Sequence, residues 1–361
     1  MSADALDGLT IHEFAVPANL ESDGADDFVE MVAMRNEVET EILGNDDTNP
    51  TPRELLPFYQ DPFAPKRLFL ARVSGRIIGR GVYEWQPEDG ATAAFLEVEV
   101  AAPFRRQGVG TSLLRVLEAS AAADGLRVLQ SWSLHLPTGS DDVLVPPTGF
   151  GAIERGSAAV RFAQAHGYRL EQVGRMSRID LPVDPDILAA KRADAAAHAT
   201  GYEVVQWVGR CPDKWLTDMA LVHRRMSTDA PSAALEFAEE DWDEERMRNL
   251  DDMNEAGGRV NLTSAALHVA SGRLVGFTDI ALPEHEGRPA SQEDTLVLKE
   301  HRGHRLGMLL KVANLEQLMR ISPVTPRITT FNAEENRPML DVNEAVGFVP
   351  TAYEAGWKKT V

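Results

Sequence analysis

The chain has 361 residues, of which 36 are Lys or Arg and 56 are Asp or Glu, so its formal net charge at neutral pH is −20. At about 100–200 residues per domain, this length predicts two domains, each with a sizeable core. The hydrophobic content of 43% and charged content of 25% are typical of globular protein. We do not expect nucleic-acid binding, because the phosphate backbone requires a clustered basic surface.

The single cysteine, Cys211, excludes an internal disulfide and a four-thiolate zinc site, and it suits a reducing cytoplasm. The first residues lack the positively charged start and apolar core of a secretory signal. No apolar run approaches the roughly 20 residues that span a bilayer. We therefore expect a soluble, cytoplasmic protein without membrane partners. We also expect no metal site, because His301 and His304 have no further ligands nearby at suitable spacing.

Two similar series of elements are expected along the chain. The first has a strand at 11–16, a helix at 28–42, a hairpin at 68–73 and 77–83, a strand at 95–100, a helix at 109–123, a strand at 128–133, a helix at 157–165 and a last strand. The second has a strand at 203–208, a helix at 213–226, a hairpin at 265–269 and 274–280, a strand at 295–298, a helix at 306–321, a strand at 327–331, a helix at 336–345 and a last strand. The order βαβββαβαβ predicts an α/β fold, with a mixed sheet covered by helices on both faces.

An internal repeat supports this division. The sequence SGRIIG at 74–79 recurs as SGRLVG at 271–276, and Val100, Arg105 and Gly110 recur as Val297, Arg302 and Gly307. Both matches have an offset of 197 positions, which indicates a duplicated domain of about 180 residues. We expect domains at 1–181 and 201–361, joined by a helical linker at 182–200. We assign the additional residues of the first half to a surface loop at 134–150.

The chemistry is expected where a strand leads through a glycine loop into a helix, at residues 97–111. Free backbone N–H groups and the positive end of the helix dipole attract an anion there, and Arg105 and Arg106 add donors. The loop lacks both the Walker sequence and a complete dinucleotide-binding signature. By itself, this segment fits a plain glycine turn as well as an anion site.

Val100, Arg105, Gly108 and Gly110 resemble the pyrophosphate-binding motif of the GNAT acetyltransferases, with Pro103 one place later than usual. A later family signature resembles Asn336, Asn343 and Gly347-Phe348 at their spacing. The resemblance occurs once in each half, and the layout is similar to the tandem GNAT group of actinobacterial type that includes mycothiol synthase. It implies two tandem GNAT folds, acetyl-CoA as co-substrate and an amine acceptor.

The resemblance also implies which residues bind acetyl-CoA. In the first half these are Val98, Val100, Arg105, Arg106, Gln107, Gly108, Val109, Gly110 and Thr111. In the second half they are Leu296, Val297, Arg302, Gly303, His304, Arg305, Leu306, Gly307, Asn332 and Asn336. The first half keeps both loop glycines but has Gly156 and Ala163 where the second has Asn336 and Asn343. The second half keeps the asparagines, but Arg305 replaces a glycine and must keep its side chain off the ligand.

The family reaction requires a base for the ammonium and an acid for the departing thiolate. The base implied is a carboxylate on the fourth strand, which is Glu97 or Glu99 in the first half and Asp294 in the second. A solvated strand face is the plainer interpretation of these carboxylates. Asn343 stands where the family often has an acidic tyrosine, and because Asn cannot give a proton, Tyr353 is the alternative candidate.

We therefore expect an N-acetyltransferase that acts on a small-molecule amine or a peptide N-terminus, as a monomer or homodimer. The second half is favoured as catalytic because its asparagines survive. The alternatives are a catalytic first half, a non-catalytic acyl-CoA sensor, and a structural pair of folds without a ligand.

Overall fold

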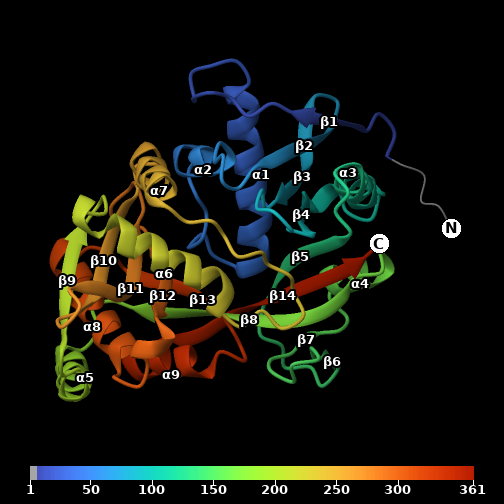
Figure 1. The fold of residues 1–361 in the computed structure, drawn as a ribbon. Coiled ribbons are helices and arrows are strands. Elements are labelled where there is room, and N and C mark those ends of the chain that lie inside the picture. The colour runs from blue at the N-terminus through green and yellow to red at the C-terminus, as the bar shows by residue number, and fades with distance from the viewer. Residues whose placement is uncertain (1–5) are drawn as a thin grey trace. The chain divides into compact units, whose positions relative to one another are not determined.

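The computed structural model describes residues 6–361, and they form two compact units (Figure 1). The first unit contains the chain through Gly174 together with Ser232–Ala238 and Ala352–Val361. The second contains Arg175–Pro231 and Glu239–Thr351. Each unit therefore includes segments from distant parts of the sequence. The division expected near residues 181 and 201 stays a prediction about the duplicated halves.

The first unit is a mixed sheet with helices on both faces. Its elements are β1 (Thr10–Phe14), α1 (Ala25–Leu43), α2 (Pro52–Tyr59), β2 (Lys66–Val73), β3 (Arg76–Trp85), β4 (Ala93–Val100), α3 (Val109–Ala123), β5 (Val128–His135), β6 (Val143–Leu144), β7 (Ile153–Glu154), α4 (Ala158–Ala165) and the start of β8 (Arg169–Asp180). The strands β1 to β4 pair antiparallel in sequence order, and β4 pairs parallel with β5. The expected hairpin turns through Ser74 and Gly75, whose φ values are 50° and 85°.

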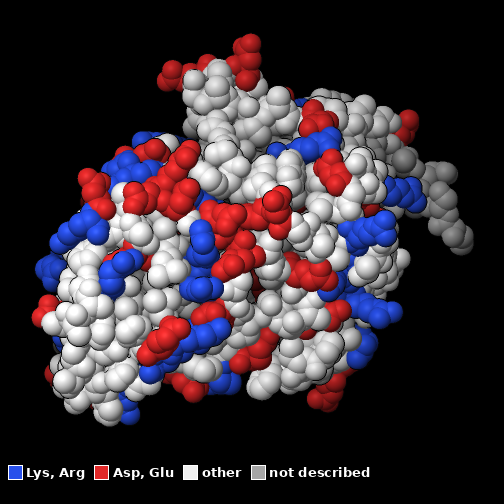
Figure 2. All heavy atoms as spheres, in the orientation of Figure 1, with Lys and Arg blue, Asp and Glu red and all other residues white. Residues whose placement is uncertain are grey.

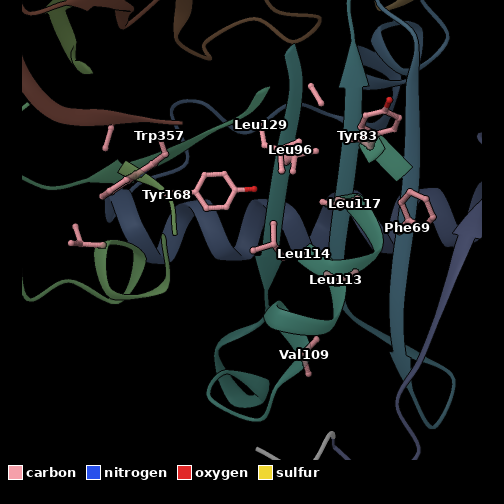
Figure 3. Packing of buried hydrophobic residues seen from close by; sticks show 14 of the residues in the cluster. Phe69, Tyr83, Leu96, Val109, Leu113, Leu114, Leu117, Leu129, Tyr168 and Trp357 are labelled. Atoms are coloured by element: carbon pink, nitrogen blue, oxygen red, sulfur yellow. The ribbon is translucent and has the colours of Figure 1, made fainter. Parts of the chain in front are cut away.

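Strand alternation places one set of apolar side chains on each face of this sheet. On one face Leu96 packs against Leu113 and Leu117 of α3, and Figure 3 shows these side chains in one cluster. On the other face Leu68 and Val82 pack against Phe28 of α1. The sheet is thus buried on both sides, as its apolar runs predict.

The last strand, β14 (Val349–Thr360), completes the first unit although it ends the chain. It pairs antiparallel with β5 from Tyr353↔His135 to Thr360↔Val128, and Figure 1 shows it in red beside green β5. Trp357 is 1% exposed and donates a 2.8 Å hydrogen bond from Nε1 to Ser133 Oγ. The C-terminal strand is therefore part of this unit's core.

The second unit repeats the layout. Its elements are the end of β8, α5 (Pro185–His198), β9 (Tyr202–Val208), α6 (Leu216–Asp229), α7 (Glu244–Ala256), β10 (Val260–His268), β11 (Arg273–Leu282), β12 (Ala290–Val297), α8 (Leu306–Ile321), β13 (Arg327–Ala333), α9 (Arg337–Val346) and the first residues of β14. The strands β9 to β12 pair antiparallel, and β12 pairs parallel with β13. Phe277 packs toward α6 and α7, whereas Val275 packs toward α5 and α8.

The structure adds elements that the sequence patterns did not predict. The helix α2 begins at a capping box in which Thr51 Oγ1 accepts from Glu54 N (3.1 Å) and Glu54 Oε2 accepts from Thr51 N (2.6 Å). The loop expected at 134–150 contains β6, which pairs with β7. Within the helical linker expected at 182–200 the structure has α5, and its Ala195 packs against Leu306 of α8. The strand expected at 295–298 begins earlier, at Ala290, so it includes Asp294.

Candidate functional site

In each unit the sheet is interrupted between the two parallel strands. The pair β4 and β5 is in register only from Ala93↔Val128 to Phe95↔Gln130, and β12 and β13 only at Ala290↔Ile328 and Ser291↔Thr329. Beyond these points the strands continue without pairing to each other. The ends of β4 and β12 thus leave backbone groups free on one edge.

In each unit one backbone N–H points toward this interruption, that of Val100 in the first unit and that of Val297 in the second. The neighbouring N–H groups show why. Leu298 N donates to Val275 O (2.9 Å), and Ala101 N donates to Ile78 O (2.9 Å). Because hydrogen bonds alternate along a strand, the N–H groups of Val297 and Val100 point to the opposite edge, toward the interruption. This is where a carbonyl oxygen could be polarised.

The two loops that follow have the same backbone shape with the residue types exchanged. In the first unit the left-handed positions are Arg106 (φ 63°) and Gly108 (φ 82°). In the second they are Gly303 (φ 87°) and Arg305 (φ 54°). A left-handed conformation costs a non-glycine residue about 1–2 kcal/mol, so each loop bears this cost once.

The side chain of Arg305 is held away from the loop, as the replacement of a glycine at this position requires. It pairs with Asp194 of α5, which holds the guanidinium beside α5. Its backbone forms the N-cap of α8 without a side-chain cap, so the first N–H groups of α8 remain available to an anion. Gly108 has the same place before α3.

Arg105 and Arg302 shape these loops. Arg105 Nε donates to Val100 O (2.8 Å) and Arg302 Nε donates to Val297 O (2.9 Å). Their outer nitrogens pair with Glu41 and Asp229, respectively. Each arginine ties its loop back to the end of the preceding strand, and its charge is already compensated. Within residues 6–361, Arg106 makes no hydrogen bond or ion pair.

The space beside the helix start differs between the units. In the first unit, a Cβ on Gly110 would lie 3.3 Å from the Phe162 ring. That ring packs on His166 at 4.6 Å, and His166 Nε2 lies 3.1 Å from Thr111 Oγ1. In the second unit, a Cβ on Gly307 would meet nothing within 4 Å. The site beside α8 is therefore open, and its counterpart beside α3 is filled by α4.

The expected asparagines of the second unit lie together. Asn343 is 1% exposed, and its Nδ2 donates to Asn332 Oδ1 (2.7 Å). Asn343 Oδ1 is buried without a hydrogen-bond partner among the described residues. Asn336 is at the start of α9, where its carbonyl accepts from Leu340 N (3.0 Å). A buried, unused acceptor is suited to an amide N–H of a ligand.

The remaining residues expected to bind acetyl-CoA mostly pack or cap. In the first unit, Val98, Val100 and the buried Val109 join the apolar cluster under α3, and Gln107 Nε2 donates to Pro103 O (2.9 Å). In the second unit, Leu296 packs toward α6, and Val297 and Leu306 pack toward α5. The His304 ring lies 5.1 Å from the Tyr202 ring. Their side chains are engaged within the protein, which leaves their backbone groups for a ligand.

The carboxylates of β4 are neutralised within the first unit. Arg80, whose side chain is 5% exposed, pairs with Glu97 (2.8 Å) and Glu99 (2.5 Å) and also bonds to the Tyr59 hydroxyl. Burial opposes the charge on Arg80, but Glu99 and its neighbours still raise the Arg80 pKa well above its usual value. Glu97 and Glu99 are thus held as ion-pair partners.

The carboxylates of the second unit have no such cation. The closest ionisable partner of Asp294 is His223, with 4.0 Å between Oδ2 and Nδ1, and burial lowers the pKa of His223 to about 3, so its ring is uncharged. Loss of solvation, followed by the charges of Glu293 and Glu240, raises the pKa of Asp294 to about 7. Its side chain is 45% exposed, so the carboxylate is accessible from solvent.

Asp279 on β11 is a second unneutralised carboxylate. The β11–β12 register shifts between Thr278 and Ile280, so Asp279 lies opposite the bulge that contains Asp294. Burial and then the charge of Asp294 raise the pKa of Asp279 to about 8, against a hydrogen bond from Thr263. Its Oδ1 has no hydrogen-bond partner among the described residues.

Tyr353 is placed in the first unit, opposite His135, whereas Asn343 belongs to the second. The sequence analysis missed Arg80, Asp279 and His223. The repeat contains a usable signal for the first two, because the 197-position offset sets Phe277 against Arg80 and Asp279 against Val82.

Charges elsewhere are interspersed, as Figure 2 shows for one face of the molecule. None of the helices within residues 6–361 has the length and apolar character of a membrane span. In the same residues, no group of three or more potential ligand side chains is arranged to hold a metal ion.

Each unit thus has a mixed sheet whose two parallel strands separate, followed by a loop that leads into a helix. This arrangement, present twice, is that of a tandem GNAT fold. Residues 34–137 match the family model of the Acetyltransferase (GNAT) family. A tandem GNAT protein from the clavulanic acid biosynthesis pathway is similar in structure, with a TM-score of 0.72, 24% identity and 98% of each chain covered. The chain therefore has a tandem GNAT fold, which confirms the fold class predicted from the sequence.

Other solved structures share this fold at lower identity. A GCN5-related N-acetyltransferase from Sphaerobacter thermophilus has a TM-score of 0.60 and 13% identity, with 99% of this chain and 96% of that chain covered. An acetyltransferase from Pyrococcus horikoshii has a TM-score of 0.55 and 11% identity, with 99% and 90% covered. No curated protein sequence matches the chain.

Proposed function

We propose that the protein transfers the acetyl group of acetyl-CoA to a primary amine of a small molecule or peptide, and that the second unit is catalytic. One contrast carries this assignment. Asp294 stands on the splayed strand with no cation, whereas Arg80 neutralises its counterpart Glu97. A carboxylate committed to an ion pair is a poor base, and one with a pKa near neutrality is a good one.

The residues of the second unit fit acetyl-CoA. The uncapped N-terminus of α8 offers N–H groups to a pyrophosphate, and the space beside Gly307 is open. Asn343 Oδ1 is a buried acceptor for an amide N–H of the pantetheine. Bound there, acetyl-CoA would supply an activated thioester carbonyl.

The chain's own groups would then act in order. Asp294 accepts a proton from the acceptor ammonium, and the freed amine forms a bond to the carbonyl carbon. The Val297 N–H stabilises the charge that develops on the carbonyl oxygen. The C–S bond breaks, the nitrogen of the new amide loses its second proton to solvent, and the thiolate takes a proton from solvent, which gives a neutral amide and free CoA. Asn343 orients the ligand and supplies no proton.

A second candidate is catalysis in the first unit. It is supported by a loop that keeps Gly108 and Gly110, by the family match over residues 34–137, and by Tyr353, which β14 brings to β5. Phe162 beside Gly110 and the Arg80 ion pairs weigh against it.

Calorimetric titration of acetyl-CoA separates the two candidates. Gly307→Trp should abolish binding, because the new side chain enters the open space beside α8 while the backbone φ stays ordinary. Gly110→Trp, at the repeat position that corresponds to Gly307 and also without a positive φ, is the matched control and should leave binding unchanged. Loss of binding in Gly110→Trp alone would assign the first unit, and absence of binding to wild type would overturn the acetyltransferase proposal.

A further inference from the structure

We propose that the second unit recognises its acceptor as a single primary ammonium on an apolar body, with Asp279 as a binding residue beside Asp294. The ammonium would occupy the role that the Arg80 guanidinium has in the first unit. This inference rests on the proposed function, and it adds the class of acceptor and a residue that binds it.

The internal repeat supplies the reference arrangement. In the first unit, the carboxylates on this face of the sheet have a built-in cation, since Arg80 contacts both Glu97 and Glu99. At the 197-position offset, Phe277 replaces Arg80 and Leu296 replaces Glu99. Asp294 keeps the place of Glu97. The second unit therefore retains the acidic position but has lost its cation.

A second carboxylate lies two residues from the position where the cation was lost. Asp279 replaces Val82, and by strand alternation it points to the same face of β11 as Phe277. Within the described part of the chain, no lysine or arginine forms an ion pair with Asp279 or Asp294. Two adjacent carboxylates without a cation repel each other, which a bound cation would relieve.

Asp279 is more than nine-tenths buried, at 7% exposure. Its carboxylate forms a hydrogen bond with Thr263, and its Oδ1 has no partner among the described residues. A buried acceptor left unsatisfied is costly, and buried polar groups in folded proteins are nearly all paired. An ammonium group has the three N–H donors that this oxygen and Asp294 lack.

Nearby cations are already used. Arg246 pairs with Glu240 (3.1 Å), Arg248 with Asp251 (2.7 Å), and Arg259 with Glu293 (2.6 Å). Glu240, Asp251 and Glu293 are therefore compensated, whereas Asp279 and Asp294 have no Lys or Arg partner within the described residues. This favours an acceptor with one positive charge over a polyamine.

The rest of the site is apolar. Phe277 and Leu296 belong to the same cluster as Met219 and Met247, and the buried His223 ring lies between Phe277 (4.5 Å) and Trp242 (4.6 Å). His223 is uncharged because its pKa is lowered to about 3. Such walls bury an aliphatic or aromatic body rather than a second charge.

The test compares tyramine, which has one ammonium on an aromatic body, with spermidine. In wild type, kcat/KM should favour tyramine. Asp279→Asn should raise the KM for tyramine about 10- to 100-fold, which is the size expected for a lost hydrogen bond to a charged group. It should leave the calorimetric Kd of acetyl-CoA unchanged. Asp252→Asn, which removes a carboxylate already paired with Arg210, is the matched control and should not change the KM.

Two results would overturn the inference: an unchanged tyramine KM in Asp279→Asn, or a preference of wild type for spermidine. Direct titration of tyramine into the protein keeps the test independent of turnover. If acetyl-CoA does not bind at all, the proposed function fails, yet tyramine binding that Asp279→Asn removes would still support the ammonium site. If acetyl-CoA binds and tyramine does not, the inference fails and the cofactor assignment stands. Asp279→Ser serves if the Asn variant does not fold.

Discussion

Asn343 donates a 2.7 Å hydrogen bond from Nδ2 to Asn332 Oδ1, and this bond fixes which way the Asn343 amide faces. The amide oxygen is consequently left as a buried acceptor. Asn343 of α9 thus presents its Oδ1 atom as an acceptor next to the end of β13.

Replacing Asn343 by Leu should weaken acetyl-CoA binding about tenfold, because it removes the buried acceptor while keeping the side-chain volume. Calorimetry gives the Kd directly. Ala163, the first-unit counterpart of Asn343, provides the control, and Ala163→Asn should leave the Kd unchanged. An unaltered Kd in Asn343→Leu would remove this residue from the binding site.

Arg80→Met should destabilise the first unit by about 3 kcal/mol, because Glu99 would remain largely buried without its cation. Denaturant unfolding followed by tryptophan fluorescence measures the change. If the second unit is catalytic, acetyl transfer by the folded variant at low temperature should match wild type. A large fall in kcat in a variant that remains folded would instead point to the first unit.

The pH profile of kcat/KM should have an acidic limb with an apparent pKa near 7. Asp294 acts as a base only when it is deprotonated, and its pKa is raised to about 7, so activity is lost as pH falls through that value. Because Asp279 interacts with it, the limb belongs to the pair of carboxylates. Asp294→Asn should lower kcat about 100- to 1000-fold and remove the limb. A limb that persists in this variant would show that another base operates.

Trp357→Ala should destabilise the protein by about 3–5 kcal/mol, although the residue is only four positions from the C-terminus. Its ring is 1% exposed, and the substitution also leaves Ser133 Oγ without its indole donor. Chemical denaturation measures the loss. Val361→Ala, which truncates a side chain that is more than half exposed, should have almost no effect.

Much of the fold could be predicted because apolar periodicity and the 197-position repeat act locally along the chain. The hairpins at Ser74-Gly75 and Ser271-Gly272 and the helices after each loop are of this kind. The helix α2 was missed because its start signal, the capping box of Thr51 and Glu54, is a pair of side-chain hydrogen bonds and not a hydrophobic period.

The site was only partly predictable for a different reason. Asn343 and Asp294 follow from motif spacing, but the charge state of a carboxylate depends on what a neighbouring strand places opposite it. Arg80 faces Glu99 across the β3–β4 register, and Asp279 meets Asp294 at a bulge. Neither relationship is a spacing within one element, so the motif search could not show it.

Because the end of β14 belongs to the first unit, that unit can become complete only after the segments of the second unit have been made. A ribosome that has released residues up to Gly174 has exposed β5 without the strand that covers its edge, because Tyr353–Thr360 follow much later in the chain. An uncovered strand edge is a template for association with other chains. The first unit therefore stays incomplete until the residues from Ala352 onward have been made, and a chain that stops before Ala352 would carry an incomplete core and a tendency to aggregate.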